Sequence, residues 1–356
     1  MQAIEKNFKV AISNGPSLFH KFAHNYCVSN DIDCVIVDFN SDELGKLIDD
    51  CDAVFWHYDS VDRFAPHILY ALECAGYAVF PNFKTSWSFN NKLSQALYFQ
   101  ATGAPAPRTH VFFDEGAALE WGRSADLPVV WKLSTGAGSQ NVKLLNSRYE
   151  VNSFIKKSFG SGFWTYRRFY ILKWRIDQFF KGQVGIKRIV AAVYRLIVLP
   201  KHIRDAGKER GYFLAQEFID GNDGDVRIIV IGERAFGITR KNRDNDFRAS
   251  ASGLIFHDPD LIDHKYITLA FDLAERLGAQ CVAFDFVERK GGDPVVLEIC
   301  HGFTPQGYFK CPGYWRRDLT WTEGEIEPYG WMIEQLRDEV AGRAQHRSAQ
   351  EQRQEL

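Results

Sequence analysis

Residues 281–300 read Cys281-Val-Ala-Phe-Asp285-Phe-Val-Glu-Arg-Lys-Gly-Gly-Asp-Pro-Val-Val-Leu-Glu298-Ile-Cys300. Two apolar stretches joined by a Gly-Gly-Asp-Pro turn predict a β-hairpin. One carboxylate lies within each stretch, and a carboxylate in so apolar a strand is costly unless a cation meets it. If Asp285 and Glu298 face the same side, they form the oxygen-rich kind of site that Mg²⁺ prefers. Taken alone, they could equally be solvent-facing residues of an ordinary hairpin.

The length and composition indicate a globular protein of two or three domains. The chain has 356 residues, of which 25% are charged, and a net charge of -2, which is ordinary for this class. It contains no signal peptide and no apolar run of about 18 residues, so an integral membrane protein is not expected. Seven cysteines without paired spacing favour a reducing compartment. We therefore expect a cytoplasmic protein.

Short apolar runs alternate with amphipathic stretches over the first 82 residues. The expected strands are 9–13, 34–38, 53–56 and 77–80. This βα alternation predicts a small doubly wound domain. No GxGxxG follows the first strand, so the dinucleotide-binding fingerprint is absent.

The pattern changes to antiparallel hairpins farther along the chain. The expected elements are a helix at 87–102, a strand at 109–113, a hairpin at 127–146, strands at 213–219, 226–231 and 235–240, and a helix at 263–277. The chain is therefore predicted to have an α/β (α+β) fold with domains at 1–86, 87–215 and 216–340. The polar tail at 341–356 is expected to be frayed or disordered.

Segment 148–210 differs in charge from the rest of the chain. It contains fifteen of the 43 basic residues but only four of the 45 acidic ones, interleaved with large aromatics. Three roles remain open for this insert. It could be a helical lid or oligomer contact, a surface for an anionic membrane or a polyanionic glycan, or a nucleic-acid contact, the least favoured of the three.

Candidate phosphate-binding groups lie on both sides of this insert. Lys132 precedes a turn that contains Gly136 and Gly138, and such a turn can wrap backbone N–H groups around a polyphosphate. A later apolar strand ends in a glycine-rich connector that offers backbone groups to an adenine and a carboxylate to a ribose. Arg240 and Arg248 follow it as candidate ligands for phosphate oxygens.

This ordered set resembles the ATP-grasp superfamily, most closely the branch of the ribosomal-protein glutamyl ligases. The resemblance implies an ATP-grasp fold, with a doubly wound first domain, a small central lid and a C-terminal subdomain. It also implies that ATP and Mg²⁺ are bound. The implied nucleotide contacts are Lys92, Lys132, Gly136, Gly138, Gln216, Glu217, Phe218, Ile219, Asp225 and Ser250. The implied catalytic residues are Arg227, Arg240 and Arg248, and the implied metal ligands are Asp285 and Glu298.

The chain departs from the family pattern at two positions. The active-site loop has Ser250 where the family has asparagine, and the third metal-ligand position holds Cys300 instead of asparagine. A thiol is a soft ligand and a poor partner for Mg²⁺. We therefore expect the metal to be held by Asp285, Glu298 and water, or the nucleotide site to be altered.

The resemblance implies a carboxylate–amine ligase that acts through an acyl phosphate, on a cell-surface glycan or a peptide precursor. The alternative is an ATP-binding protein that no longer ligates, or a simple phosphotransferase. The partners expected are the carboxylate and amine substrates, a second copy in a homodimer, and the inner face of an anionic membrane through the basic insert.

Overall fold

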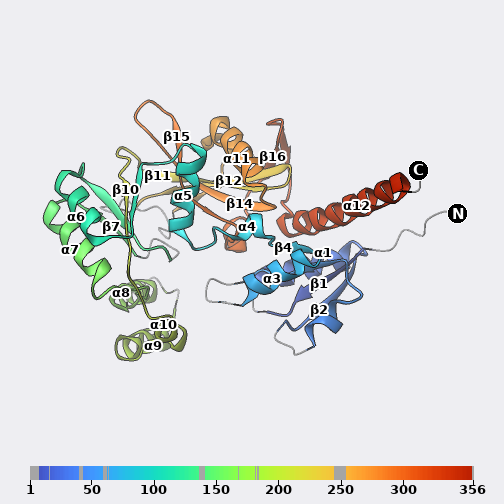
Figure 1. Cartoon of the computed structure of the whole chain (residues 1–356), viewed down its shortest axis with the longest axis horizontal. Helices are drawn as coiled ribbons and strands as arrows, with labels where there is room; N and C mark the ends of the chain where they lie inside the picture. The colour runs from blue at the N-terminus through green and yellow to red at the C-terminus, as the bar shows by residue number, and fades with distance from the viewer. Residues whose placement is uncertain are drawn as a thin grey trace. The chain divides into compact units, whose positions relative to one another are not determined.

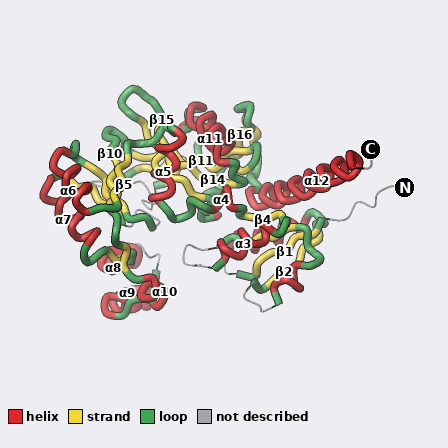
Figure 2. The backbone as a smooth tube through the Cα atoms, viewed as in Figure 1, coloured by secondary structure: helices red, strands yellow, loops and turns green. Residues whose placement is uncertain are grey.

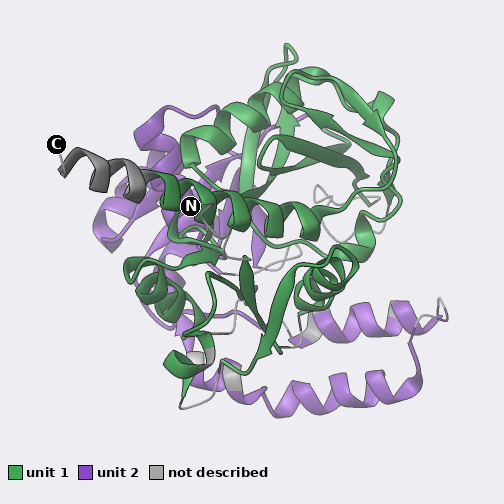
Figure 3. Ribbon diagram, turned by 90° about the vertical axis from the view of Figure 1, so that its right-hand side faces the viewer, with its two compact units in different colours: residues 1–89, 222–356 green, residues 90–221 purple. Residues whose placement is uncertain are grey.

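Two units make up the fold (Figure 3). The structure is a computed structural model that describes residues 8–15, 17–39, 43–58, 62, 64–135, 141–166, 168–180, 182, 184–243 and 254–354. The first unit combines residues 1–89 with 222–356, and the second comprises residues 90–221.

The first unit begins with the predicted parallel sheet (Figure 1). Its strands are β1 (Lys9–Ser13), β2 (Asp33–Val37), β3 (Ala53–Phe55) and β4 (Ala78–Phe80), in the order β2-β1-β3-β4. The helices between and after them are α1 (Leu18–Ser29), α2 (Leu44–Ile48), α3 (Ala65–Cys74) and α4 (Phe83–Ser86). The interior of β1 (Val10, Ala11 and Ile12) and the whole of β3 are apolar and buried, because both faces of such a sheet are covered.

An antiparallel sheet forms the rest of this unit (Figure 2). Its strands are β11 (Gly224–Ile231), β12 (Arg234–Lys241), β13 (Ile255–Phe256), β14 (Cys281–Glu288), β15 (Pro294–Cys300), β16 (Gly313–Arg316) and β17 (Trp321–Glu323). They run in the order β15-β14-β11-β12-β16-β17, with β13 beside β12. The helical elements are the 3₁₀ turns η1 (Pro259–Leu261) and η2 (Pro305–Gly307) and the helices α11 (His264–Leu277) and α12 (Pro328–Gln354).

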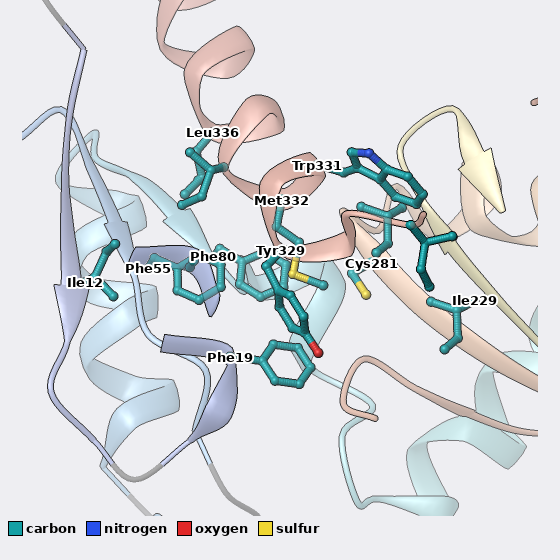
Figure 4. Close-up of a cluster of buried hydrophobic side chains, with 14 of the residues drawn as sticks. Ile12, Phe19, Phe55, Phe80, Ile229, Cys281, Tyr329, Trp331, Met332 and Leu336 are labelled. Atoms are coloured by element: carbon teal, nitrogen blue, oxygen red, sulfur yellow. The ribbon is translucent and has the colours of Figure 1, made fainter. Parts of the chain in front are cut away.

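The two sheets of this unit share one hydrophobic core; the division into domains 1–86 and 216–340 stays a prediction. Phe55 and Phe80 from the parallel sheet lie in the same buried cluster as Ile229 and Cys281 from the antiparallel sheet (Figure 4). Met332 of α12 joins them, and α12 packs on α1, β3, β4 and β11. Sequence patterns show that a strand is buried but not against which sheet, so this union could not be predicted.

The helix α12 continues to Gln354, through the segment that the sequence predicts to be a frayed or disordered tail. The segment is rich in alanine, glutamine, glutamate and arginine, which are good helix formers. Its polar composition indicates a solvated segment, but solvation does not prevent a helix.

The second unit is built on a four-stranded antiparallel sheet in the order β5-β10-β6-β7. Its strands are β5 (Thr109–Phe112), β6 (Val129–Lys132), β7 (Val142–Leu145) and β10 (Phe213–Glu217). Helices α5 (Lys92–Thr102), α6 (Glu115–Ser124) and α7 (Arg148–Phe159) accompany it. The helix predicted from 87 begins at Lys92 because the Asn91 side chain caps it by accepting from the Ser94 N–H.

Only part of the basic segment 148–210 lies outside the core of the second unit. Val151 and Ile155 of α7 are fully buried in the core of the second unit, so α7 is part of the central fold. Strands β8 (Phe163–Trp164) and β9 (Lys208–Glu209) then pair with each other. Between them lie α8 (Arg168–Phe180), α9 (Ile186–Ile197) and α10 (Lys201–Ala206).

Candidate nucleotide and metal site

The predicted hairpin of β14 and β15 places Asp285 directly opposite Glu298. Side chains alternate along a strand, and the neighbours Phe284 and Phe286 are fully buried on the face that packs on α11. Asp285 therefore faces the opposite side, and directly opposed residues share a face. Both carboxylates thus project from the same surface of the sheet.

Two arginines on the neighbouring strands converge on the same surface. Arg240 Nε and Nη2 donate to the two oxygens of Asp225 at 2.6 and 2.7 Å. The same Nη2 lies 2.9 Å from Asp285 Oδ1, and Arg227 Nη1 lies 3.4 Å from that oxygen. The register explains this convergence, because Arg227 pairs with Asp285 and Asp225 pairs with Arg240 across the ladders.

The network changes the protonation equilibria of its members. Burial, followed by the charge of Asp285, raises the pKa of Asp225, although Arg240 opposes the rise. Burial is the largest single effect and acts to lower the pKa of Arg227 and Arg240, but the surrounding negative charges, Asp285 first among them, together outweigh it and raise both. With Glu298, three carboxylates face two guanidiniums, which leaves one net negative charge to attract a cation.

The chemistry of this surface fits Mg²⁺ bound together with phosphates. Mg²⁺ is held by one or two carboxylates plus substrate phosphates more often than by an all-protein cage, and Asp285 and Glu298 offer two. Cys300 does not complete the set: its Sγ donates to Gly302 O at 3.1 Å and accepts from Gly302 N at 3.3 Å. Burial raises the pKa of the Cys300 thiol, so it stays protonated. Within the described ranges no three His, Cys, Asp or Glu residues form a metal cluster.

The surface also offers hydrogen-bond donors to an anion. Arg227 is half-buried, and its Nε is a buried atom with no hydrogen-bond partner among the residues that the structure describes. A buried guanidinium N–H without an acceptor is costly. A phosphate or carboxylate oxygen next to Arg227 would satisfy it.

The second unit contains the predicted lysines. Lys132 is buried on β6, and its Nζ donates to Gln216 Oε1 at 2.6 Å. Gln216 in turn donates to Thr109 Oγ1 at 3.1 Å, so three strands fix the position of the ammonium. Lys92 is buried at the start of α5.

The first residues of the glycine-rich turn are tied to the neighbouring elements. The Lys92 N–H donates to the Ser134 carbonyl at 3.0 Å, and the Ser134 N–H donates to Tyr212 Oη at 2.6 Å. The start of the turn is therefore held against the N-terminus of α5. Gly136 and Gly138 themselves lie outside the described residues, as do Arg248 and Ser250.

The predicted nucleotide contacts from Glu217 to Asp225 lie at the end of β10 and the start of β11. The Glu217 N–H donates to Arg108 O at 2.8 Å, and its carboxylate accepts from Arg108 N at 2.9 Å. Phe218 and Ile219 follow at the end of β10, half-buried. Both oxygens of Asp225 accept from Arg240, and the nucleotide contact expected of Asp225 stays a prediction.

Sequence patterns did not indicate that His57 and His301 lie close together in the first unit. His57 Nδ1 lies 2.9 Å from Ser17 Oγ, and its ring lies 5.7 Å from that of His301. His301 is 1% exposed, its ring lies 4.3 Å from Phe89, and burial lowers its pKa to about 3. These residues are far apart in the chain, so only the fold reveals their proximity.

Comparisons with known proteins agree with this geometry. The family model described as a RimK-like ATP-grasp domain matches residues 175–306. The curated alpha-aminoadipate–LysW ligase LysX of Saccharolobus solfataricus is 22% identical over 231 residues, covering 65% of this chain and 68% of that protein.

Solved structures show the same fold. The RimK domain ATP-grasp protein of Sphaerobacter thermophilus has a TM-score of 0.53 at 16% identity, covering 92% of this chain and 98% of its own. The ATP-grasp ligase PsnB, solved with precursor peptide PsnA2 and AMPPNP, has a TM-score of 0.53 at 14% identity, with 94% and 99% coverage. These likenesses confirm the predicted ATP-grasp fold.

The remaining sequence expectations concern compartment and membrane. All seven cysteines are free thiols. None of the described helices combines the length and the apolar composition needed to cross a bilayer. The cytoplasmic location stays a prediction.

Proposed function

This chain belongs to the RimK-like branch of the ATP-grasp superfamily, and from that premise we propose that it is an ATP-dependent ligase joining a carboxylate to an amine. One observation carries the proposal. Asp285 and Glu298 face each other on the ATP-grasp sheet, beside the guanidinium of Arg240. The related proteins LysX and PsnB are named as ligases, which supports the reaction class.

We propose the following nucleotide contacts, each taken within its own unit. Lys92 and Lys132 are proposed to neutralise the phosphates of ATP, with backbone N–H groups around Gly136 and Gly138 covering them. The segment from Gln216 to Ile219 is proposed to hold the adenine. Asp285 and Glu298 would hold Mg²⁺, which neutralises charge on the β- and γ-phosphate oxygens when it is bound.

The proposed reaction has two steps. A carboxylate oxygen of the first substrate attacks the γ-phosphorus of ATP, the bond to the β-phosphate oxygen breaks, and an acyl phosphate and ADP form. The amine nitrogen of the second substrate then attacks the acyl carbon, a C–N bond forms, inorganic phosphate leaves, and the nitrogen loses a proton.

The chain's own contribution to this reaction is positioning and electrostatics. Arg240, held by Asp225, presents a fixed guanidinium to the oxygens on which negative charge develops. Arg227 contributes a second one, with its Nε available. We propose that Arg248 assists them and that Ser250 contributes to the nucleotide site.

The experiment that tests the proposal is a coupled assay of ADP release in a matrix of carboxylates and amines. The names of the relatives suggest two first candidates, alpha-aminoadipate and a precursor peptide. A ligase releases ADP and phosphate only when both substrates are present, and it forms a product whose mass equals their sum less one water.

Two other outcomes would replace the proposal. A stable phosphorylated product that forms without any amine would identify a phosphotransferase. Magnesium-dependent ATP binding without turnover across the whole matrix would identify a nucleotide-binding protein that has lost ligase activity.

A further inference from the structure

The helix α9 exposes apolar side chains along one side. Its sequence, IKRIVAAVYRLI, has large apolar residues at intervals of three and four, the spacing of one helix face. We define the α9 apolar stripe as this set with its exposed fractions: Ile186 58%, Val190 62%, Val193 47%, Tyr194 56% and Ile197 84%. An exposed set of this size on one face is unusual for a solvated helix, so it points to a contact surface.

The α9 apolar stripe is not the face by which the helix joins the fold. α9 packs principally against α8, its neighbour within the second unit (Figures 1 and 3). Ala192 is buried, and Ile189 and Leu196 on the same side are partly buried. Arg168 of α8 donates to the Leu196 carbonyl at 2.7 Å, which fixes the pairing. The helix thus has one apolar face inside the fold and a second one outside it.

The charges around the stripe are of one sign. No acidic residue occurs from 178 to 204, whereas this stretch contains six basic residues: Lys181, Lys187, Arg188, Arg195, Lys201 and Arg204. On α9, Lys187 borders the stripe by helical spacing. The Arg195 guanidinium lies 5.9 Å from the ring centroid of Tyr194, at the stripe's edge. Within residues 178–204 the apolar face is therefore accompanied by cations and by no acidic residue, and the nearest acidic residues in the sequence are Asp177 on α8 and Asp205 on α10.

An apolar centre with basic residues at its borders distinguishes between the possible binding partners of the α9 apolar stripe. A nucleic acid needs cations at the centre of the contact, whereas here the centre is aliphatic and the cations lie at the borders and on the polar face. An amphipathic helix at a bilayer surface has that arrangement, with its apolar face among the acyl chains and its cations at the headgroups. We propose that α9 docks this protein on the surface of an anionic membrane.

The proposal is independent of the ligase reaction, because no residue of the α9 apolar stripe belongs to the candidate nucleotide and metal site. In the docked state, the helix would lie in the plane of the membrane. Burial of the apolar side chains and attraction of the cations to anionic lipid would both contribute to the free energy of binding. Each basic residue near the surface would strengthen binding roughly fivefold.

The test is flotation of the full-length chain with vesicles of phosphatidylcholine alone or with about one third phosphatidylglycerol, a strongly anionic composition. We expect binding to the anionic vesicles at low salt, weaker binding at high salt, and little binding to phosphatidylcholine. The double variant Val190→Glu/Ile197→Glu should weaken binding more than tenfold. Circular dichroism checks that it is folded.

A matched control separates docking from a general charge effect. Tyr149 and Phe113 of the second unit are 83% and 64% exposed and lie outside α9. The double variant Tyr149→Glu/Phe113→Glu adds the same charge, and it should bind anionic vesicles as well as the unmodified chain does.

Two results would overturn the proposal. One is a folded chain that does not float with anionic vesicles at low salt. The other is a concentration-dependent dimer in analytical ultracentrifugation that the Val190→Glu/Ile197→Glu variant abolishes while vesicle binding is absent, which would assign the stripe to a second copy of this chain.

Discussion

Asp285 and Glu298 occupy directly opposed positions on β14 and β15, and a register shift follows between Asp285 and Phe286. Two like charges at opposed positions destabilise a sheet. Arg240 and Arg227, which approach Asp285 from β12 and β11, offset part of this cost. The remaining negative charge makes the pair a site that gains from a divalent cation.

The first prediction concerns Glu298. Glu298→Gln removes one of the two carboxylates and should lower magnesium-dependent ADP release at least a hundredfold, because the metal loses half of its proposed protein ligands. The measurement is the coupled ADP assay together with calorimetry of MgATP binding.

The matched control for Glu298 is Glu288, a carboxylate at the far end of β14. It is paired with Lys265 at 2.6 Å and is remote from the arginine network. Glu288→Gln should retain activity within about twofold, since an exposed ion pair contributes about 1 kcal/mol or less to stability. Equal losses in both variants would argue that the hairpin matters only for folding.

The second prediction concerns Lys132 of β6, and Lys143 of the neighbouring strand β7 provides the control. Lys132→Met removes a buried ammonium and should raise the KM for ATP more than tenfold, because a desolvated cation beside a phosphate is worth more than an exposed one. Lys143 on β7 is exposed and paired with Glu150 at 2.8 Å, so Lys143→Met should leave the KM unchanged. An unchanged KM in Lys132→Met would remove this lysine from the nucleotide site.

The third prediction separates positioning from stability at Arg240. Arg240→Ala leaves Asp225 and Asp285 buried with less compensation and should lower the free energy of unfolding by about 3 kcal/mol. Arg240→Lys keeps the charge but loses the bidentate pair with Asp225, so kcat should fall more than tenfold with a smaller loss of stability. Urea unfolding and steady-state kinetics on both variants check the two effects. A lysine variant with full kcat would show that only the charge is needed.

Much of the fold could be predicted because its local signals are strong. The strand Lys9–Ser13 was predicted at its observed bounds. The helix predicted at 263–277 begins one residue later, at His264, because Asp263 caps it. The hairpin that carries Asp285 and Glu298 followed from its two apolar stretches and the Gly-Gly-Asp-Pro turn between them. Each of these features is determined by residues that lie close together in the sequence.

The features that the sequence could not predict depend on packing between distant segments. The shared core of Phe80 and Met332 joins residues far apart in the chain. Likewise, the pairing of Asp225 with Arg240 depends on the register of β11 against β12, which the sequence pattern does not determine. The helical continuation of α12 to Gln354 shows that polar composition alone does not distinguish a solvated helix from a disordered tail.

The last prediction concerns acid stability and His301. Its pKa in the fold is about 3, against an ordinary 6.5, because burial disfavours the charged ring. As the pH falls below 6.5, His301 becomes protonated in the unfolded chain but stays neutral in the folded chain. The free energy of unfolding therefore decreases progressively, by about 4 kcal/mol near pH 3.

A phenylalanine at position 301 would have a similar volume and no ionisable group, and the pocket of Phe89 and Tyr58 should accept it. His301→Phe should therefore lower the pH midpoint of acid unfolding, followed by circular dichroism, while stability at pH 8 changes by about 1 kcal/mol or less. If the midpoint stays where it is in the unmodified chain, the acid sensitivity has to be assigned to His57, whose pKa is also lowered by burial.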